Sequence, residues 1–256
     1  MAEAAKAAGY TTLGISEHTV LSDDRWDNMR LIRENVEEYF STINECALRE
    51  KEIGGLRILS GLECEPLPEY FEFYKEIKEQ HKVEFMIIGN HVFPYKGDYV
   101  WATGDRLEDQ NKIKAYADFL IKGMEIGLFT YVAHPDMFMA DKEKWDTYTA
   151  DVMKNVMRAS NAYGVPLEIN LNGYRKGLVR RGLNLRYQYQ LEEFWALAAD
   201  EGVRVVVGVD AHIPRDFGRK YPEFDELVKK YDLDIMTEEE VLSKLGVMNV
   251  GRMPSP

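Results

Sequence analysis

The chain has 256 residues, of which 45% are apolar and 30% are charged, and its formal net charge is −12. This length allows one large core, so we expect a single domain over residues 1–256. An acidic chain is poorly suited to binding nucleic acid or anionic membranes. The sequence contains no apolar run that could span a bilayer, no signal peptide and only two cysteines, which predicts a cytoplasmic protein with reduced thiols.

Short apolar runs alternate with longer amphipathic segments, which predicts an α/β fold with parallel strands. Six strands are expected, over residues 11–18, 56–65, 83–91, 128–136, 165–170 and 203–212. Helices are expected before Gly9, after Pro66, and over residues 29–51, 107–126, 143–162, 190–201, 225–231 and 238–245. Loops are expected over residues 94–104 and 171–182, and residues 247–256 are expected to form a frayed tail.

Polar side chains follow several of these expected strands. Four of the five histidines lie at the C-terminal end of a strand, namely His18, His91, His134 and His212. Two carboxylates, Glu63 and Asp210, reach the same edge, and Asp210 leaves its strand on the same side as His212. The carboxyl ends of parallel strands meet on one face. A single histidine at such a position is usually a hydrogen-bonded core or loop residue, but four of them on one rim favour a metal site.

Imidazoles and carboxylates without thiolates are the ligands of zinc, iron or manganese. Six candidate ligands exceed what one ion needs, so two to three divalent ions are expected. Two ions bridged by a carboxylate are a recurring device for hydrolysing phosphate esters. The pattern therefore favours a metal-dependent hydrolase that acts on a small phosphorylated substrate.

Several short motifs resemble those of the polymerase and histidinol phosphatase (PHP) family of phosphoesterases. They are Ile15-Ser-Glu-His18, Gly61-Leu-Glu63, Gly89-Asn-His91, Ala133-His-Pro-Asp136 and Gly208-Val-Asp-Ala-His212. The segment Glu168-Ile-Asn-Leu-Asn-Gly-Tyr-Arg-Lys176 is similar to one in the histidinol-phosphatase branch. The resemblance implies a distorted (β/α)7 barrel with a three-metal centre at its C-terminal rim.

The resemblance also implies roles for the rim residues. Glu63 would bridge two ions, and His91 and His134 would share one of them. Asp210 would bind the second ion, while His18 and His212 would hold a third. Arg175 would contact the substrate phosphate, for which its planar guanidinium is suited.

The chain departs from the family pattern in three ways. Glu17 stands where an aspartate is usual, and Val209 where a serine is usual. The family's first strand, with its His-x-His pair, has no counterpart after Met1. We expect the sequence to begin inside a longer chain; otherwise the protein is a variant with an open barrel that holds its second and third ions weakly and is unstable or oligomeric.

The function expected is hydrolysis of a phosphomonoester by a metal-bound hydroxide, with histidinol phosphate, a compound of histidine biosynthesis, as the first candidate. Two alternatives are a phosphatase acting on a nucleotide, sugar phosphate or phosphodiester, and a degenerate barrel that binds metal without catalysis. Arg215 is a candidate second phosphate contact beside the rim. Asp136 either orients His134 or closes a turn, and Arg180, Arg181 and Arg186 either extend the phosphate site or face solvent.

Overall fold

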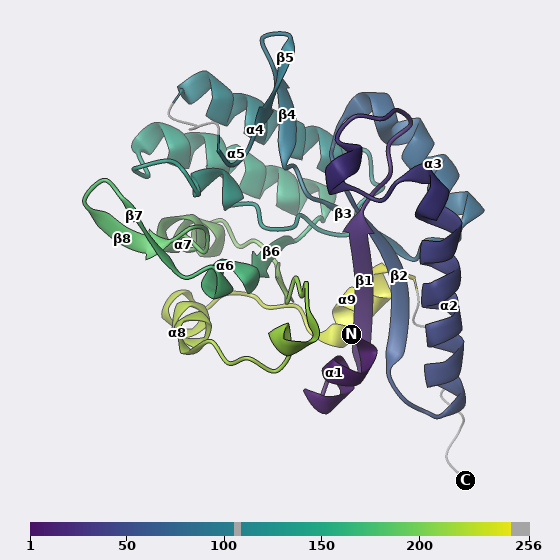
Figure 1. The fold of residues 1–256 in the computed structure, drawn as a ribbon. Coiled ribbons are helices and arrows are strands. Elements are labelled where there is room, and N and C mark those ends of the chain that lie inside the picture. Colours follow the sequence, from purple (N-terminus) through teal and green to yellow (C-terminus); the bar gives the residue numbers. More distant parts are fainter. Residues whose placement is uncertain (105–108, 247–256) are drawn as a thin grey trace.

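The computed structural model describes residues 1–104 and 109–246, which form a mixed α/β fold (Figure 1). The α-helices are α1 (Ala2–Ala7), α2 (Val36–Glu52), α3 (Phe71–Gln80), α4 (Gln110–Glu125), α5 (Thr147–Tyr163), α6 (Asn172–Arg175), α7 (Glu192–Asp200), α8 (Pro222–Tyr231) and α9 (Glu238–Lys244). The strands are β1 (Thr12–His18), β2 (Arg57–Cys64), β3 (Phe85–Ile88), β4 (Val92–Tyr95), β5 (Asp98–Trp101), β6 (Leu167–Asn170), β7 (Leu178–Arg181), β8 (Asn184–Tyr187) and β9 (Val205–Gly208). The expected tail, residues 247–256, lies outside the described residues.

The parallel strands form one curved sheet. β1, β2 and β3 pair in that order, and β6 pairs with β9. Val132 joins the two groups through bridges to Ile88 and Leu167, and Ile235 extends the sheet beyond β9 through a bridge to Val205. Within the described residues, nothing pairs β1 with the far edge of this sheet, so the expected barrel is open.

The fourth expected strand, over residues 128–136, is reduced to one ladder residue. Val132 alone bridges both neighbours, although Thr130 and Ala133 also donate their N–H groups to the carbonyls of Met86 and Ile88 in β3. His134 ends the run because its φ of +44° turns the backbone out of the extended region. The expected strand was therefore correct in position and too long in extent.

Two expected loops contain antiparallel hairpins instead. β4 pairs with β5, and β7 pairs with β8. Lys96 and Gly97 join the first pair with φ values of 54° and 85°, the positive values that a two-residue hairpin turn requires. Gly182, with φ of 57°, begins the turn of the second. Our prediction of irregular loops was wrong because a glycine turn between short polar and aromatic runs is a hairpin signal.

The helix expected from residue 29 begins at Val36. The preceding residues form two 3-10 turns, Asp27–Met29 and Arg33–Asn35. Trp26 has φ of 60°, which keeps the chain from continuing into a helix at this point. The resulting turns direct the Arg30 side chain inward, where it pairs with a buried carboxylate described below. His81, expected on the surface, has an 8% exposed side chain and stacks on Phe40 with ring centroids 4.6 Å apart.

Helices cover the outside of the curved sheet, and side chains fill much of its inside. α2 packs along β2, while α4, α5, α7 and α8 contact one another in sequence around the other side (Figure 1). Inside, the Phe85 ring occupies the space that side chains at Gly14 and Gly61 would need, since a Cβ there would lie 2.8 and 2.2 Å from the ring. Leu242 and Leu245 pack against the cluster that Phe85 forms with its neighbours.

A short clasp connects β1 to α9 at the N-terminal end of the sheet. Thr11 Oγ1 donates to the Glu238 carboxylate at 2.9 Å, and Thr12 Oγ1 donates to it at 2.5 Å. The two ends of the open sheet are therefore linked by side chains that line one side of the cavity, while the C-terminal ends of the strands carry the rim. No helix among the described residues has the length and apolar composition that crossing a membrane demands.

Candidate metal centre

His18, Glu63, His91 and His134 meet at the C-terminal ends of neighbouring strands, as predicted. The β1–β2 register places His18 opposite Glu63. β3 lies next to β2, and the chain leaves β3 just before His91. His134 follows Val132, the bridge residue beside β3. Parallel pairing therefore delivers residues that are far apart in sequence to one side of the rim.

Glu63 lies at the centre of these four residues, which we call the Glu63 cluster. Its Oε1 is 2.9 Å from His134 Nε2 and 3.4 Å from His91 Nε2, and its Oε2 is 4.0 Å from His18 Nδ1. One ligand atom each of His18, Glu63 and His91 lies within 4.8 Å of the others. This imidazole and carboxylate set fits a divalent ion such as zinc, iron or manganese.

The members of the cluster shift one another's pKa. Burial acts to raise the pKa of Glu63, but His91 and His134 hold it well below its usual range. Burial lowers the pKa of His18. Burial also acts to lower the pKa of His134, yet its hydrogen bond with Glu63 raises it to about 9. Glu63 is therefore ionised and His18 neutral at pH 7, as metal binding requires, and an ion would displace the His134 proton.

A second buried carboxylate, Glu65, orients His91. Glu65 Oε1 lies 3.0 Å from His91 Nδ1 and accepts a hydrogen bond from Arg30 Nη2 at 2.9 Å. The Glu65 and Arg30 side chains are 1% and 3% exposed. Despite burial, His91 and Arg30 hold the pKa of Glu65 at about 2. Because Nδ1 is engaged, Nε2 of His91 is the nitrogen that faces Glu63. No sequence motif singled out Arg30, and Glu65 was visible only as a carboxylate ending a strand.

Glu168 on β6 supports His134 from behind. Its Oε2 accepts hydrogen bonds from the backbone N–H of His134 at 3.1 Å and from Asn170 Nδ2 at 2.9 Å. Gly208 leaves the room for it, since a Cβ there would lie 1.6 Å from Glu168 Oε1. Burial raises the pKa of Glu168 to about 7. The Glu-x-Asn pattern was readable in the sequence, but its contact with the left-handed His134 backbone was not.

Asp210 and His212 lie apart from the Glu63 cluster. Asp210 Oδ1 is 3.5 Å from His212 Nδ1, and Asp210 Oδ2 accepts a hydrogen bond from Asn172 at 2.9 Å. The His212 side chain is 67% exposed, against 27% for Asp210. In the described part of the chain, only the three ligand atoms of His18, Glu63 and His91 are close enough to share one ion.

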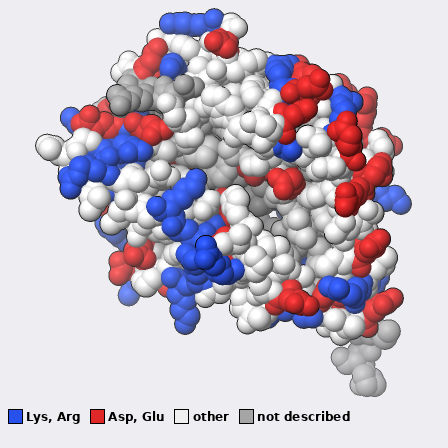
Figure 2. Space-filling view, viewed as in Figure 1, with Lys and Arg blue, Asp and Glu red and all other residues white. Residues whose placement is uncertain are grey.

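His18 and Glu63 of the cluster line one cavity of about 830 Å³ inside the open sheet, together with Asp210 and His212. Its walls are β1 on one side and residues 206–212 on the other, and Tyr131 and Glu168 contribute to it between them. The surface is hollowed near the C-terminal end of β1, with acidic residues in the hollow and a group of Lys and Arg side chains beside it (Figure 2). A small anion could therefore meet positive charge at the edge of an acidic site.

The two arginines expected to contact phosphate have different surroundings. The Arg175 side chain is 6% exposed, with its guanidinium donating to the carbonyl oxygen of Val209 at 2.6 Å and to that of Asp210. Arg175 Nε also lies 3.7 Å from Asp216. Arg175 thus supports the loop that carries Asp210, whereas Arg215 is exposed. The contact of either arginine with a phosphate stays a prediction.

Asp136 follows His134 and connects the rim to α7. Its Oδ2 accepts hydrogen bonds from the backbone N–H groups of Gln190 and Leu191, both at 2.7 Å, and from Trp195 Nε1 at 3.2 Å. Burial raises its pKa. These three bonds make Asp136 a structural carboxylate that fixes the loop after His134.

The histidine and carboxylate rim on a parallel sheet defines a metal-binding α/β protein. Comparison with known proteins then gives the family. The family model described as the PHP domain matches residues 1–172. The chain therefore belongs to the PHP domain family, as its motifs predicted.

Relatives of this chain include histidinol phosphatases. A probable histidinol-phosphatase from Deinococcus radiodurans is 24% identical over 232 residues, covering 87% of this chain and 82% of the relative. A histidinol phosphate phosphatase from Lactococcus lactis, solved with zinc, L-histidinol and phosphate, has a TM-score of 0.62 at 15% identity over 91% of this chain and 87% of the other. A structure from Listeria monocytogenes, provisionally assigned to the same enzyme, has a TM-score of 0.69 at 14% identity over 88% of this chain and 92% of the other.

The same fold also occurs outside histidinol phosphatases. A chain in archaeal ribonuclease P, solved with mature tRNA, has a TM-score of 0.52 at 13% identity over 98% of this chain and 90% of the other. At these identities the structural likeness shows the fold alone. The activity therefore has to be argued from the rim residues.

Proposed function

We propose that the chain is a metal-dependent phosphatase that hydrolyses a small phosphomonoester, with histidinol phosphate as the first candidate. The Glu63 cluster carries this proposal, because it sets a carboxylate that is only 12% exposed among three imidazoles at the rim of a large cavity. The names of the relatives from Deinococcus radiodurans and Lactococcus lactis support the substrate class. Divalent ions, when bound, supply positive charge that stabilises phosphate oxygens and activates water.

The chain's own residues would have different roles in this reaction. His18, Glu63 and His91 would hold one ion, and His134, which is hydrogen-bonded to Glu63, would join them after losing its proton. Asp210 and His212, across the cavity, are the residues that would hold further ions. Arg175 and Arg215 would add positive charge near the phosphate. The supporting contacts of Glu65 and Glu168 hold two of the imidazoles in place, so that little rearrangement is needed when an ion binds.

The test uses metal content and turnover together. The protein loaded with zinc, manganese or iron is assayed for phosphate release from histidinol phosphate, a nucleotide monophosphate, a sugar phosphate and a phosphodiester. Glu63→Gln should lose both bound metal and turnover, whereas the exposed Glu45→Gln on α2 should keep both. Full activity in Glu63→Gln would contradict the proposal. Preference for another ester would change the substrate and leave the chemistry intact.

A non-enzymatic metal-binding role is the second candidate. It is favoured by the separation of Asp210 and His212 from the Glu63 cluster, which leaves a single three-residue ligand group in the described chain. In that case the protein would bind about one ion per chain and release no phosphate from any of the four esters. Metal stoichiometry of two or three with turnover would exclude it.

A further inference from the structure

The β7–β8 hairpin, residues 178–187, carries an exposed apolar face. Leu178 and Leu185 are 54% and 59% exposed, and Leu183 in the turn is 95% exposed. Leu185 lies directly opposite Arg180, and Leu178 precedes Arg180 by two residues, so these three side chains share one face. The hairpin extends away from the body of the molecule (Figure 1). Such a cluster of exposed leucines is typical of an interaction surface.

The opposite face of the hairpin is firmly attached to the body. Arg181 Nε donates to the Ala140 carbonyl at 2.6 Å. Arg186 Nη2 donates to the carbonyls of Met139 and Lys142, each at 2.6 Å. These bonds fix the hairpin to the segment before α5 and leave its leucines exposed. A two-stranded hairpin with one uncovered apolar face is marginal in water, which favours a further covering layer.

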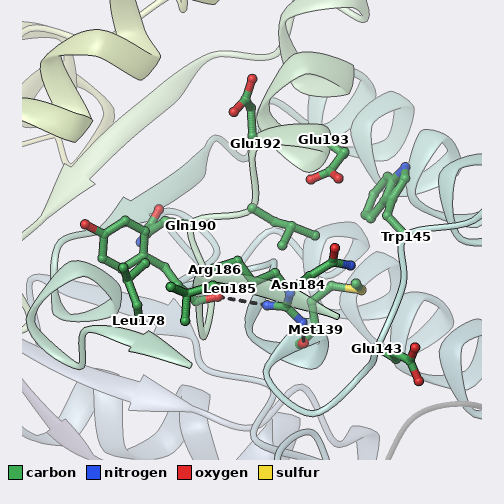
Figure 3. Close-up of a pocket in the computed structure, with 12 residues that line it drawn as sticks. Met139, Glu143, Trp145, Leu178, Asn184, Leu185, Arg186, Gln190, Glu192 and Glu193 are labelled. Carbon is green, nitrogen blue, oxygen red and sulfur yellow. Dashed lines mark hydrogen bonds between the residues drawn. The ribbon is translucent and has the colours of Figure 1, made fainter. Parts of the chain in front are cut away.

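A pocket of about 400 Å³ opens beside the hairpin (Figure 3). Its apolar walls are Met139, Trp145 and Leu191 of the body and Leu178 and Leu185 of the hairpin itself. The carboxylates of Glu143, Glu192 and Glu193 line it as well. Glu192 already binds Lys230 and Tyr231. In the described part of the chain, neither Glu193 nor the hairpin's Arg180 forms an ion pair. The molecule therefore presents a projecting basic and apolar element next to an acidic and apolar hollow.

We propose that two copies of this chain form a dimer in which each hairpin docks into the partner's pocket. In a dimer with two-fold symmetry, the hairpin of each copy can contact the pocket of the other. Both contacts are then identical, and no further copy is needed to complete the assembly. The leucines would then be buried against Trp145 and Leu191, and Arg180 would meet Glu193 of the partner subunit. This local charge pairing offsets the repulsion expected between two chains of net charge −12. The proposal does not depend on the phosphatase activity.

Sedimentation velocity of the full chain over a range of concentrations gives the first test. The wild-type protein should sediment as a dimer, and Leu183→Ser should raise the dimer dissociation constant about tenfold or more, because the loss of one buried leucine has an effect of that order. Leu48→Ser is the matched control, since Leu48 is 62% exposed on α2 and lies away from the hairpin. Both leucines are exposed, so neither change should affect folding, which circular dichroism checks.

Charge exchange gives the second test. Arg180→Glu and Glu193→Arg should each weaken the dimer, and the double variant should restore it, because the swapped charges again pair across the axis. A wild-type protein that stays monomeric, assembles beyond a dimer, or responds equally to Leu183→Ser and Leu48→Ser would overturn the proposal. Failure of the double variant to recover any affinity would equally overturn it.

Discussion

The two sides of the cavity rim differ in how tightly their polar residues are held. On the β2 side, Glu63 contacts three imidazoles, and its side chain is only 12% exposed. On the β9 side, His212 is 67% exposed and is held chiefly by Asp210. The difference shows that a histidine or carboxylate at a strand end does not by itself make a preorganised metal site. A preorganised site also needs buried partners behind each ligand.

The largest effect should follow from breaking the buried side. His134→Ala removes an imidazole that is 2.9 Å from Glu63, and we expect metal affinity to fall by more than about a hundredfold. His212→Ala, at the exposed side, should lower affinity for the first ion by less than about tenfold. Isothermal titration with zinc or manganese measures both. Equal losses in the two variants would contradict the contrast between the two sides.

Removing the support of one ligand should have the next largest effect. Glu65→Gln leaves Glu63 and the imidazoles unchanged. It weakens the hydrogen bond that orients His91, and it leaves Arg30 without a buried anion. We expect metal affinity to fall about 10- to 100-fold, and the free energy of unfolding to fall by about 3 kcal/mol. Glu72→Gln, whose partner Lys75 is on the surface, serves as the control and should change both by little. Chemical denaturation and metal titration separate the two effects.

A smaller effect should come from crowding Glu168. Gly208→Ala places a Cβ within 1.6 Å of Glu168 Oε1, so the carboxylate must move away from the His134 backbone. We expect a loss of about 1–3 kcal/mol in stability and about tenfold in metal affinity. If stability falls while metal affinity is unchanged, Glu168 acts on packing alone and does not help to position His134.

The smallest effect is expected at Glu240, a carboxylate outside the rim, and it serves as a reference for the effects at the rim. The backbone N–H of Thr237 and the Arg204 guanidinium hold the pKa of Glu240 at about 2, below its unfolded value of 4.5. Its contribution to stability is therefore present above about pH 4.5 and is lost as the pH falls toward 2. The difference in unfolding midpoint between wild type and Glu240→Gln should shrink over this window. A difference that is constant with pH would contradict the prediction.

The sequence predicts the parts of this fold that depend on local pattern. Short apolar runs identified the parallel strands, and polar residues at their ends identified His18, Glu63, His91 and His134 as neighbours. The supporting contacts of Arg30 and Glu168 could not be predicted, because both residues act on segments that are distant in the chain. The separation of Asp210 from Glu63 was equally hidden, since it depends on the spacing of the two edges of an open sheet.

The clasp between β1 and α9 has a consequence for the order of folding. Thr12 and Glu238 are separated by 226 residues, so their contact closes a very long loop. The residues of the Glu63 cluster all lie within the first 134 residues and leave the ribosome well before Glu238 does. We therefore expect the buried side of the rim to gather early during synthesis, whereas the cavity gains its final shape only when α9 arrives.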